Sequence, residues 1–509
     1  MDSDRRKRVA ATGWIELQSK IYGCTVAGMN PNEFRVVGHQ LIDTLAAYLE
    51  TVEGKSVFPD VAPETLHALF DEPLPQQGAQ PNALLRELDQ KFFPYCSHVG
   101  HPGYMGLITP SPTPIGILGD LIASALNQNI GAYTIGPSGV AMERRVVRWL
   151  CDLAGYPASS DGHLTSGGMM ANFVGLKLAR DWATGDRAQH DGVTERLAAY
   201  TSEERHISVD KAADAVGIGR NGLRVLPTDD RYRLRIDALE AAIADDRRNG
   251  VRPICIIAMG GSTNTGTVDD LHALRRIADR EQMWLHVDAA YGGGLLVSPT
   301  WRPVLSGIEL ADSLTIDPHK WFFAPLDAGA ILVREGRQLT ASFGMQPAYL
   351  TDEMDRKKER YQYYVHSFEQ SRRLRGLKVW LSFKRYGSAQ IADWIDANVR
   401  HARRLYDRVR QSDDFVAATE PTMSAICIRY VKGGLSQSDS AELHPLVARR
   451  VEEDGRFWFS TTVLKGDSYF RICPVNFRTR DEHMDQLFEF LREECRQELE
   501  KFGEKQLTN

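Results

Sequence analysis

The sequence predicts an α/β fold in which a mostly parallel sheet is covered by helices. Short apolar runs occur at residues 254–259, 283–287, 313–316 and 329–333. A helical stripe of Leu271, Leu274 and Ile277 lies between the first two runs. Strands that alternate with helices imply crossover connections, which join parallel strands. We therefore expect this sheet to form the centre of a large domain.

The length of the chain predicts more than one structural part. A single hydrophobic core stops growing near ~250–300 residues, and this chain has 509. We expect an N-terminal helical arm over residues 1–95, a large domain over residues 96–385 and a smaller C-terminal α+β domain over residues 386–509.

The N-terminal arm begins with a clear helix signal. Asn30 can cap a helix, Pro31 stands in its first turn, and Glu33 follows three residues after the cap. One apolar stripe then recurs at helical spacing: Phe34, Val37, Leu41, Leu45 and Leu49. This stripe can pack on its own chain or on a second subunit, and its pattern leaves both possibilities open.

The C-terminal third begins with a charged segment. Residues 352–360 contain eight charged side chains in nine positions, which predicts a solvated surface segment. Beyond Ser371 a long helix leads into the C-terminal part. A last helix over residues 481–502 places four apolar side chains on one face: Met484, Leu487, Phe488 and Leu491.

Composition excludes several classes of protein. Sixty-one basic against 67 acidic side chains give a net charge of -6, which disfavours nucleic acid as a partner. No apolar stretch approaches the ~18 residues of a membrane span, and the first residues lack the apolar core of a signal peptide. Seven scattered cysteines without a CxxC disfavour a disulfide framework and structural zinc. We therefore expect a cytoplasmic protein that binds small molecules.

Two motifs in the chain are misleading. Residues 217–222 match the dinucleotide pattern GxGxxG, which requires a strand before it and a helix after it. Here a helical pattern precedes the glycines and a strand pattern follows, so we reject this interpretation. His98 and His101 form a bare HxxH without a third ligand, and we expect no metal site there.

Four other signals point to one cofactor. Ser166, Gly167 and Gly168 precede a helical run, and glycines at a helix N-terminus expose N–H groups that bind an anion such as a phosphate. Asp288 ends an apolar strand, at the edge where open α/β sheets bind ligands. A buried carboxylate needs a cationic or N–H partner, and a pyridinium nitrogen would be one.

The remaining two signals are a lysine and a histidine. Lys320 follows a strand and a Pro-His turn and is flanked by aromatic residues, which suits a desolvated amine that forms a Schiff base. His206 could stack on a ring. A phosphate-binding loop, a carboxylate and a lysine together match what pyridoxal phosphate requires of a protein.

These motifs resemble the group II pyridoxal-phosphate-dependent amino-acid decarboxylases, and most closely their aromatic-L-amino-acid decarboxylase branch. The resemblance rests on HVDAAYGG at residues 286–293 and DPHKW at 317–321, and it extends over nearly the whole chain. Residues 29–61 resemble the swapped N-terminal arm of that family, residues 101–102 and 127–131 its substrate side, and residues 470–478 its C-terminal domain. The resemblance implies an aspartate-aminotransferase-like fold and a homodimer with its active site at the subunit interface.

The resemblance also assigns roles around the cofactor. Lys320 would form the Schiff base, Asp288 would pair with the pyridine nitrogen, and His206 and Ala290 would lie on opposite faces of the ring. The positions that would surround the phosphate or lie beside the cofactor are Ser166, Gly167, Gly168, Met169, Thr263, Asp317 and His319. Many relatives have serine or threonine where Met169 stands, so only backbone N–H groups would serve at this position. Asp269 resembles a second aspartate of the family.

The resemblance favours decarboxylation over an oxidative reaction. Tyr349 falls in a segment that resembles the catalytic loop, where it would help to return a proton to the substrate carbon. Tyrosine at this place is associated with decarboxylation, and phenylalanine with relatives that consume oxygen and make aldehydes. We expect a lyase that acts on an L-amino acid, with an aromatic one favoured. The alternatives are an oxygen-consuming aromatic aldehyde synthase, a decarboxylase of a smaller amino acid and, disfavoured by its retained site residues, a cofactor-free scaffold.

The resemblance gives less information about the substrate. The positions that would line its side-chain pocket are His101, Leu107, Ile108, Thr109, Tyr133 and Ser371. This set is less aromatic than in animal relatives, which permits a smaller substrate. Ser371 falls where plant relatives carry serine for phenolic substrates, so it favours tyrosine-like molecules slightly.

Overall fold

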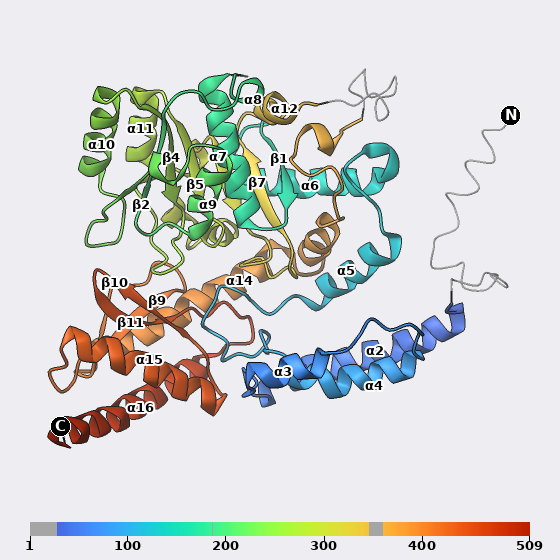
Figure 1. Ribbon diagram of the computed structural model, residues 1–509, viewed down its shortest axis with the longest axis vertical. Helices are drawn as coiled ribbons and strands as arrows, with labels where there is room; N and C mark the ends of the chain where they lie inside the picture. The colour runs from blue at the N-terminus through green and yellow to red at the C-terminus, as the bar shows by residue number, and fades with distance from the viewer. Residues whose placement is uncertain (1–27, 186, 346–359, 509) are drawn as a thin grey trace. The chain divides into compact units, whose positions relative to one another are not determined.

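The computed structural model describes residues 28–185, 187–345 and 360–508 (Figure 1). The chain divides into two compact units. The first takes in the residues up to Lys55 together with Pro59–Ser97, and the second consists of Ser56–Phe58 and His98–Asn509. Among the described residues, none of the helices has the length and apolar character of a membrane span.

The first unit is helical, as predicted. It contains α2 (Pro31–Thr51), α3 (Pro63–Phe70), α4 (Pro81–Lys91) and the short 3-10 turns Val52–Gly54 and Phe93–Tyr95. The predicted cap at Asn30 is confirmed, because its side-chain oxygen accepts hydrogen bonds from the N–H groups of Asn32 (3.0 Å) and Glu33 (2.9 Å). None of the residues of these three helices is buried, so their apolar side chains stay exposed.

A seven-stranded sheet forms the centre of the second unit and confirms the predicted α/β class. Its strand order is β1-β7-β6-β5-β4-β2-β3, and only β7 runs against the others. The strands are β1 (Asp161–Thr165), β2 (Leu197–Ser202), β3 (Leu223–Leu226), β4 (Arg252–Met259), β5 (Trp284–Asp288), β6 (Ser313–Ile316) and β7 (Gly329–Val333). The four apolar runs identified in the sequence are β4, β5, β6 and β7.

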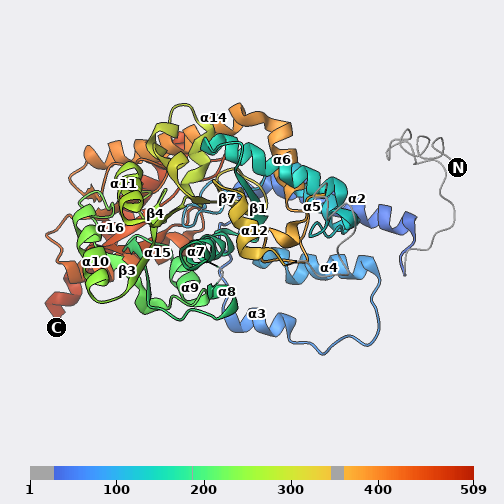
Figure 2. The ribbon, with the colours of Figure 1, turned by 90° about the horizontal axis from the view of Figure 1, so that it is seen from above.

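Helices cover both faces of this sheet (Figure 2). On one face lie α7 (Gly168–Thr184), α9 (Ile207–Ala215) and α12 (Arg337–Phe343). On the other lie α6 (Pro137–Ala154), α10 (Ile236–Arg248), α11 (Leu271–Glu281) and part of α14 (Gly376–Arg410). Both faces are therefore buried, which is the rule for parallel sheets.

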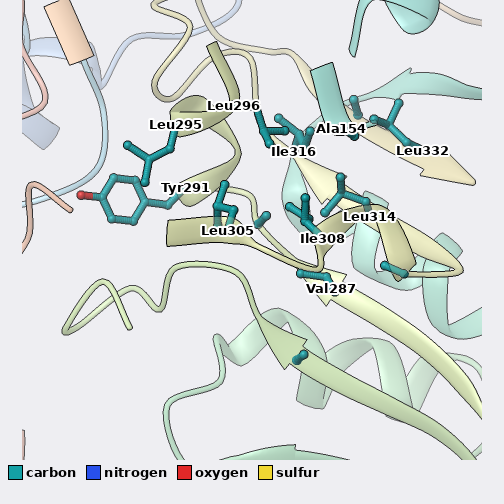
Figure 3. Close-up of a cluster of buried hydrophobic side chains, with 14 of the residues drawn as sticks. Ala154, Val287, Tyr291, Leu295, Leu296, Leu305, Ile308, Leu314, Ile316 and Leu332 are labelled. Carbon is teal, nitrogen blue, oxygen red and sulfur yellow. The ribbon is translucent and has the colours of Figure 1, made fainter. Parts of the chain in front are cut away.

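The α6 face holds the larger hydrophobic core (Figure 3). Strands and helices meet there through fully buried side chains, among them Ala154, Val287, Leu295, Leu305, Leu314, Ile316 and Leu332. Since side chains alternate along a strand, Trp284, His286 and Asp288 of β5 point to the opposite face, toward α7.

The remaining elements connect these layers. They are α5 (Pro114–Leu126), α8 (Arg187–His190) and the 3-10 turns Tyr133–Ile135, Arg220–Gly222, Gly292–Val297, Arg302–Leu305, Ile308–Leu310 and Tyr363–Val365. The rejected dinucleotide motif lies between the end of α9 and the start of β3. A helix therefore precedes the glycines and a strand follows them, which is the reverse of the order that the motif requires. Within the described ranges, no group of three or more His, Cys, Asp and Glu side chains is placed to hold a metal ion.

The C-terminal part has its own antiparallel sheet, in the order β10-β11-β9-β8. Its elements are β8 (Phe415–Ala417), β9 (Ile426–Tyr430), α15 (Gln437–Asp454), β10 (Ser460–Leu464), β11 (Asp467–Ile472) and α16 (Asp481–Thr508). The predicted apolar face of α16 is confirmed, because Met484, Leu487, Phe488 and Leu491 are all buried. The predicted boundary between residues 385 and 386 falls inside α14, next to its non-helical residue Gly387.

Candidate cofactor site

A cavity of about 340 Å³ opens where β1, β5 and β6 end. It brings together every residue that was predicted to surround the cofactor within the described chain: Ser166, Gly167, Gly168, Met169, His206, Thr263, Asp288, Ala290, Asp317, His319 and Lys320. Its lining also includes residues without a predicted role: Asn172, Ser208, Met259, Gly261, Ser262, Tyr291 and Leu326.

Lys320 is held in the turn that follows β6. Its backbone N–H donates to the carbonyl oxygen of Asp317 at 2.9 Å, and its Nζ lies 3.3 Å from Oδ2 of the same residue. The other carboxylate oxygen, Oδ1, is buried and has no hydrogen-bond partner within the described part of the chain. The lysine side chain is 22% exposed, so its amine remains accessible from the cavity.

His319 stabilises the same turn. The ring nitrogen Nδ1 of His319 accepts a hydrogen bond from the backbone N–H of Ala328 at 3.1 Å. The backbone N–H of His319 donates to the carbonyl oxygen of Ala328 at 3.0 Å. Burial lowers the pKa of His319, so the ring is neutral at physiological pH.

The N-terminus of α7 faces this turn. A Cβ atom on Gly168 would lie 2.8 Å from Oδ2 of Asp317 and 3.1 Å from Cβ of Ala290, so only glycine permits this close approach. The first N–H groups of a helix have no partner within the helix and carry part of its positive dipole. Together with Gly167, the N-cap, they form an anion-binding position at the edge of the cavity. Met169, the second residue of α7, is 43% exposed beside them.

Asp288 ends β5 with a buried carboxylate. Its Oδ1 accepts a hydrogen bond from the N–H of Ala290 at 3.1 Å, and its Oδ2 accepts one from Nδ2 of Asn172 at 2.7 Å. Both donors are neutral, so they stabilise the carboxylate of Asp288 by hydrogen bonds without cancelling its negative charge. The site is therefore suited to a cationic group in the cavity.

His206 caps the start of α9 with its side chain. Its Nδ1 accepts a hydrogen bond from the N–H of Ser208 at 3.2 Å and lies 2.8 Å from the hydroxyl of the same residue. Burial lowers the pKa of His206, and the positive charge of Lys320 acts in the same direction, whereas Asp288 and Asp317 oppose them. The lowered pKa makes the imidazole neutral near pH 7.

Three buried side chains support the site although the sequence interpretation gave them no role. Asn172 and Ser208 connect Asp288 to His206. Arg471 of β11 is 3% exposed, and its Nε donates to the carbonyl oxygen of Thr263 at 2.8 Å. A signal existed for Asn172, because it stands four residues after Gly168 and so lies on the same helix face.

Two further residues that were singled out in the sequence are Tyr349 and Asp269. Tyr349 lies outside the described residues. Asp269 is buried below β4, where its carboxylate accepts hydrogen bonds from the N–H groups of Leu234 and Met259, each at 2.7 Å. Burial raises the pKa of Asp269 to about 6. These contacts indicate a structural role for this aspartate.

The residues predicted to line the substrate pocket are not part of the cavity lining of this single chain: His101, Leu107, Ile108, Thr109, Tyr133 and Ser371. His101 is buried and its Nδ1 accepts a hydrogen bond from the N–H of Gly103. Ile108 packs in the large hydrophobic core, whereas Leu107 is 49% exposed. The backbone N–H of Tyr133 donates to the side chain of Gln362, and Ser371 is exposed. Their role in substrate binding stays a prediction.

The cavity fits pyridoxal phosphate on the chemistry of its groups. An accessible amine can form a Schiff base with an aldehyde, a buried carboxylate can hold a protonated ring nitrogen, and a helix N-terminus can bind a phosphate. The absence of a side chain at Gly168 leaves space at the helix N-terminus, the phosphate end of this arrangement.

Comparison with known proteins agrees with this chemistry. Residues 63–431 match the family model described as the pyridoxal-dependent decarboxylase conserved domain. The chain is 32% identical over 460 residues to the aromatic-L-amino-acid decarboxylase of Bacillus atrophaeus, which covers 90% of this chain and 95% of that protein. It is 27% identical to tryptophan decarboxylase 2 of Oryza sativa subsp. japonica, over 93% of this chain and 96% of that protein.

Two further relatives extend this agreement. Phenylacetaldehyde synthase of Arabidopsis thaliana is 27% identical to the chain, over 93% of this chain and 98% of that protein. The crystal structure of Oryza sativa TDC with PLP and tryptamine superimposes with a TM-score of 0.88 at 27% identity, covering 93% of this chain and 99% of that one. The chain belongs to the pyridoxal-dependent decarboxylase family and is a pyridoxal-phosphate-dependent amino-acid decarboxylase.

Proposed function

We propose that the protein decarboxylates an aromatic L-amino acid to its amine and carbon dioxide at the cavity around Lys320. The observation that carries this proposal is the juxtaposition of Lys320, Asp288 and His206 in one cavity, next to the N-terminus of α7. The names of the relatives support the aromatic class, because they include an aromatic-L-amino-acid decarboxylase and a tryptophan decarboxylase.

Each of these residues has a task that its surroundings explain. When bound, pyridoxal phosphate supplies an electron sink for the electron pair that the departing carboxylate leaves behind. Lys320 would hold the cofactor through its Nζ. Asp288 keeps a proton on the ring nitrogen, because its carboxylate is buried and has only neutral donors of its own. His206 and Ala290, which both line the cavity, would hold the ring between them.

The phosphate end and the proton donor complete the site. Backbone N–H groups at Gly167, Gly168 and Met169 would bind the phosphate, and Ser166 and the turn of Asp317 and His319 would lie around it. Thr263 lies beside the cofactor, held by Arg471 through its carbonyl oxygen. Tyr349 returns a proton to the substrate carbon, which the resemblance of its segment to the catalytic loop supports.

The substrate side chain lies against His101, Leu107, Ile108, Thr109, Tyr133 and Ser371. The serine at position 371 favours a phenolic side chain slightly. Because none of these six residues lines the cavity of one chain, this part of the proposal depends on a second subunit.

We also propose that the protein is a cytoplasmic homodimer with its active site at the subunit interface. Helices α2, α3 and α4 bury none of their residues, and Phe34, Phe70 and Leu84 on these helices are 62%, 54% and 47% exposed. Exposed apolar side chains on successive helices indicate a surface that a partner covers. Residues 1–95 then serve as the dimerisation arm, residues 96–385 as the cofactor domain and residues 386–509 as the small domain.

A substrate panel tests the reaction and its substrate class together. The purified protein, supplied with pyridoxal phosphate, is incubated with tyrosine, phenylalanine, tryptophan and small L-amino acids. We expect equimolar carbon dioxide and amine from at least one aromatic substrate, without oxygen uptake. Turnover of small amino acids alone would reject the aromatic class. A protein that shows no yellow absorbance after cofactor addition would overturn the proposal as a whole.

One relative, the phenylacetaldehyde synthase of Arabidopsis thaliana, supports the alternative that the protein is an oxygen-consuming aldehyde synthase. Replacing Tyr349 distinguishes the two reactions. We expect Tyr349→Phe to lower the amine yield and to produce aldehyde, ammonia and oxygen uptake, because the proton donor is removed. An unchanged amine yield in this variant would remove Tyr349 from the mechanism.

A further inference from the structure

A chain of buried polar side chains lies between α7 and the central strands. Asn172 of α7 contacts residues of β5 and β6, and one residue near the start of α9. Helix α7 can come this close because residue 175 is glycine. A Cβ atom there would lie 2.5 Å from Cε1 of His286.

Asp288 fixes the orientation of the Asn172 amide. A carboxylate only accepts hydrogen bonds, so the amide group at 2.7 Å from Oδ2 of Asp288 must be the NH₂ group, Nδ2. The amide oxygen, Oδ1, is therefore turned the other way. The directions of the other hydrogen bonds among these buried polar side chains follow from this assignment.

On the inner side, Oδ1 of Asn172 accepts two hydrogen bonds. One comes from the hydroxyl of Thr315 at 2.7 Å, and the other from Nε2 of His286 at 3.0 Å. His286 then carries its proton on Nε2, and since burial lowers its pKa to about 4, Nδ1 is a free acceptor. The hydroxyl of Ser313 donates to that Nδ1 at 2.8 Å and accepts from Nε1 of Trp284 at 2.8 Å. Every group on this side is satisfied.

On the outer side, the second N–H of Nδ2 reaches the cavity wall. It donates to Oγ of Ser208 at 2.8 Å, so the single hydroxyl proton of Ser208 is left for Nδ1 of His206, at 2.8 Å. The backbone N–H of Ser208 donates to the same Nδ1. A ring nitrogen that accepts two hydrogen bonds carries no proton, so in the neutral ring the proton of His206 is on Nε2.

We propose that Asn172 is a positioning residue that sets the hydrogen-bond direction at Asp288 and at His206 together, and thereby presents His206 to the cavity as an Nε2–H donor. This inference rests on the proposed roles of Asp288 and His206 at the cofactor. One amide then serves two requirements of the site. It stabilises the carboxylate as an acceptor for the ring nitrogen, and it keeps a donor N–H on the ring face.

The charges around His206 do not favour the other tautomer. The groups that act on this ring are Asp288 at the end of β5, Asp317 and Lys320 after β6, and Asp210 on α9 itself. None of these contacts Nδ1, which is occupied by Ser208. Their effect is on the charge of the ring, whereas the contacts to Ser208 decide which nitrogen carries the proton of its neutral form.

The tautomer is measured directly by nitrogen NMR of the full-length protein with pyridoxal phosphate bound. Histidine is labelled with ¹⁵N in both ring nitrogens, and the signals of residue 206 are identified by their loss in His206→Gln. Protonated and unprotonated ring nitrogens have well-separated shifts. We expect a protonated Nε2 and an unprotonated Nδ1 for His206. A protonated Nδ1 would overturn the proposal.

Two variants test the coupling through Asn172. Asn172→Leu has a similar volume and removes both the hydrogen bond to Asp288 and the hydrogen bond to Ser208. Ser208→Ala removes only the connection to His206 and leaves the hydrogen bond between Asn172 and Asp288. We expect the pH at which His206 titrates to rise in both variants. Ser208→Ala removes the hydroxyl that donates to Nδ1, whereas Asn172→Leu removes the N–H that keeps this hydroxyl turned toward Nδ1, so the hydroxyl can then accept from a protonated ring. We expect the cofactor dissociation constant to rise about tenfold or more in Asn172→Leu, and to rise less in Ser208→Ala, which keeps the contact to Asp288.

The outcomes separate a positioning role from a general loss of structure. Unchanged His206 titration in Asn172→Leu, or equal loss of cofactor affinity in both variants, would overturn the proposal. If Asn172→Leu does not fold, the titration of His206 in Ser208→Ala tests the proposal alone. An unchanged titration in that variant would contradict the connection from Asn172 through Ser208 to His206. Neither measurement uses a substrate, so their failure is distinct from failure of the substrate panel that tests the proposed function.

Discussion

The two faces of the central sheet differ in kind although the same strands supply both. Toward α6, strands β5 and β6 present the apolar side chains Leu285, Val287, Leu314 and Ile316 to the large core. Toward α7, the alternating positions carry Trp284, His286, Asp288, Ser313 and Thr315. Both faces are buried. A fully covered parallel sheet can thus use one face for cohesion and the other to orient hydrogen bonds toward a site.

The energetics of the two faces differ accordingly. Burial of a leucine or valine side chain contributes ~1.5–3 kcal/mol through the apolar area removed from water. A buried hydrogen bond contributes only about 0.5–1.5 kcal/mol net, yet an abandoned partner costs about 1–3 kcal/mol. Changes on the α6 face should therefore lower stability first, and changes on the α7 face should alter the site first.

The largest expected effect is at the end of the polar face. Lys320→Ala should lower turnover at least about a thousandfold, because the lining of the cavity, among the described residues, holds no second lysine that could take its place. We expect the melting temperature to change little, since this side chain is partly exposed. Carbon dioxide release and the yellow absorbance band measure the two consequences. Steady-state activity near that of the unmodified enzyme would refute the assignment.

On the apolar face, Leu314→Ala should act in the opposite way. We expect the free energy of unfolding to fall by about 2–5 kcal/mol, because the truncation leaves a cavity in a fully buried core. At temperatures where the variant is folded, turnover should stay within a few fold. Chemical denaturation together with initial rates gives both numbers. A large loss of turnover without a loss of stability would contradict the distinction between the two faces.

Acidification should weaken both parts of the second unit through buried histidines. Burial lowers the pKa of His286, on the polar face, and of His444, in the C-terminal part, to about 4, below the ordinary 6.5. The unfolded chain then binds more protons than the folded one, so stability is complete above pH 6.5 and is lost as the pH falls toward 4. The loss is roughly 3 kcal/mol for each ring.

Variants of these histidines measure this pH dependence. In His444→Gln the decrease in unfolding free energy between pH 6.5 and 4.5 should be shallower than in the unmodified protein. His286→Gln should show the same change and also alter cofactor affinity, because only His286 is bound to Asn172. Identical pH profiles in all three proteins would show that neither ring resists protonation.

The smallest effect is expected from Thr315→Val, a change of nearly equal volume. It removes one of the two donors to Oδ1 of Asn172 and leaves the other, Nε2 of His286. We expect a loss of about 1 kcal/mol in stability and less than a threefold change in cofactor affinity. Denaturation and cofactor titration check both. A tenfold loss of cofactor affinity would mean that Thr315 itself contributes to the site.

The sequence allowed the sheet and the chemical groups of the cavity to be predicted for physical reasons. Apolar runs of strand length marked β4 to β7, and a carboxylate or lysine directly after such a run lies at the ligand-binding edge. The network around Asn172 was not predictable in this way. Its partners lie 36, 114, 116 and 143 residues away, and nothing in the local pattern of α7 indicates them. The contact of Arg471 with Thr263 spans 208 residues and was equally hidden.

The glycine at position 175 has a consequence for engineering. Glycine inside a helix costs roughly 1 kcal/mol relative to alanine, so a search for thermostable variants would choose this position among the first. Here the added methyl group would meet the ring of His286. The helix would have to shift away from β5 and carry Asn172 with it. The usual route to a more heat-resistant helix would thus yield an enzyme that holds its cofactor less well.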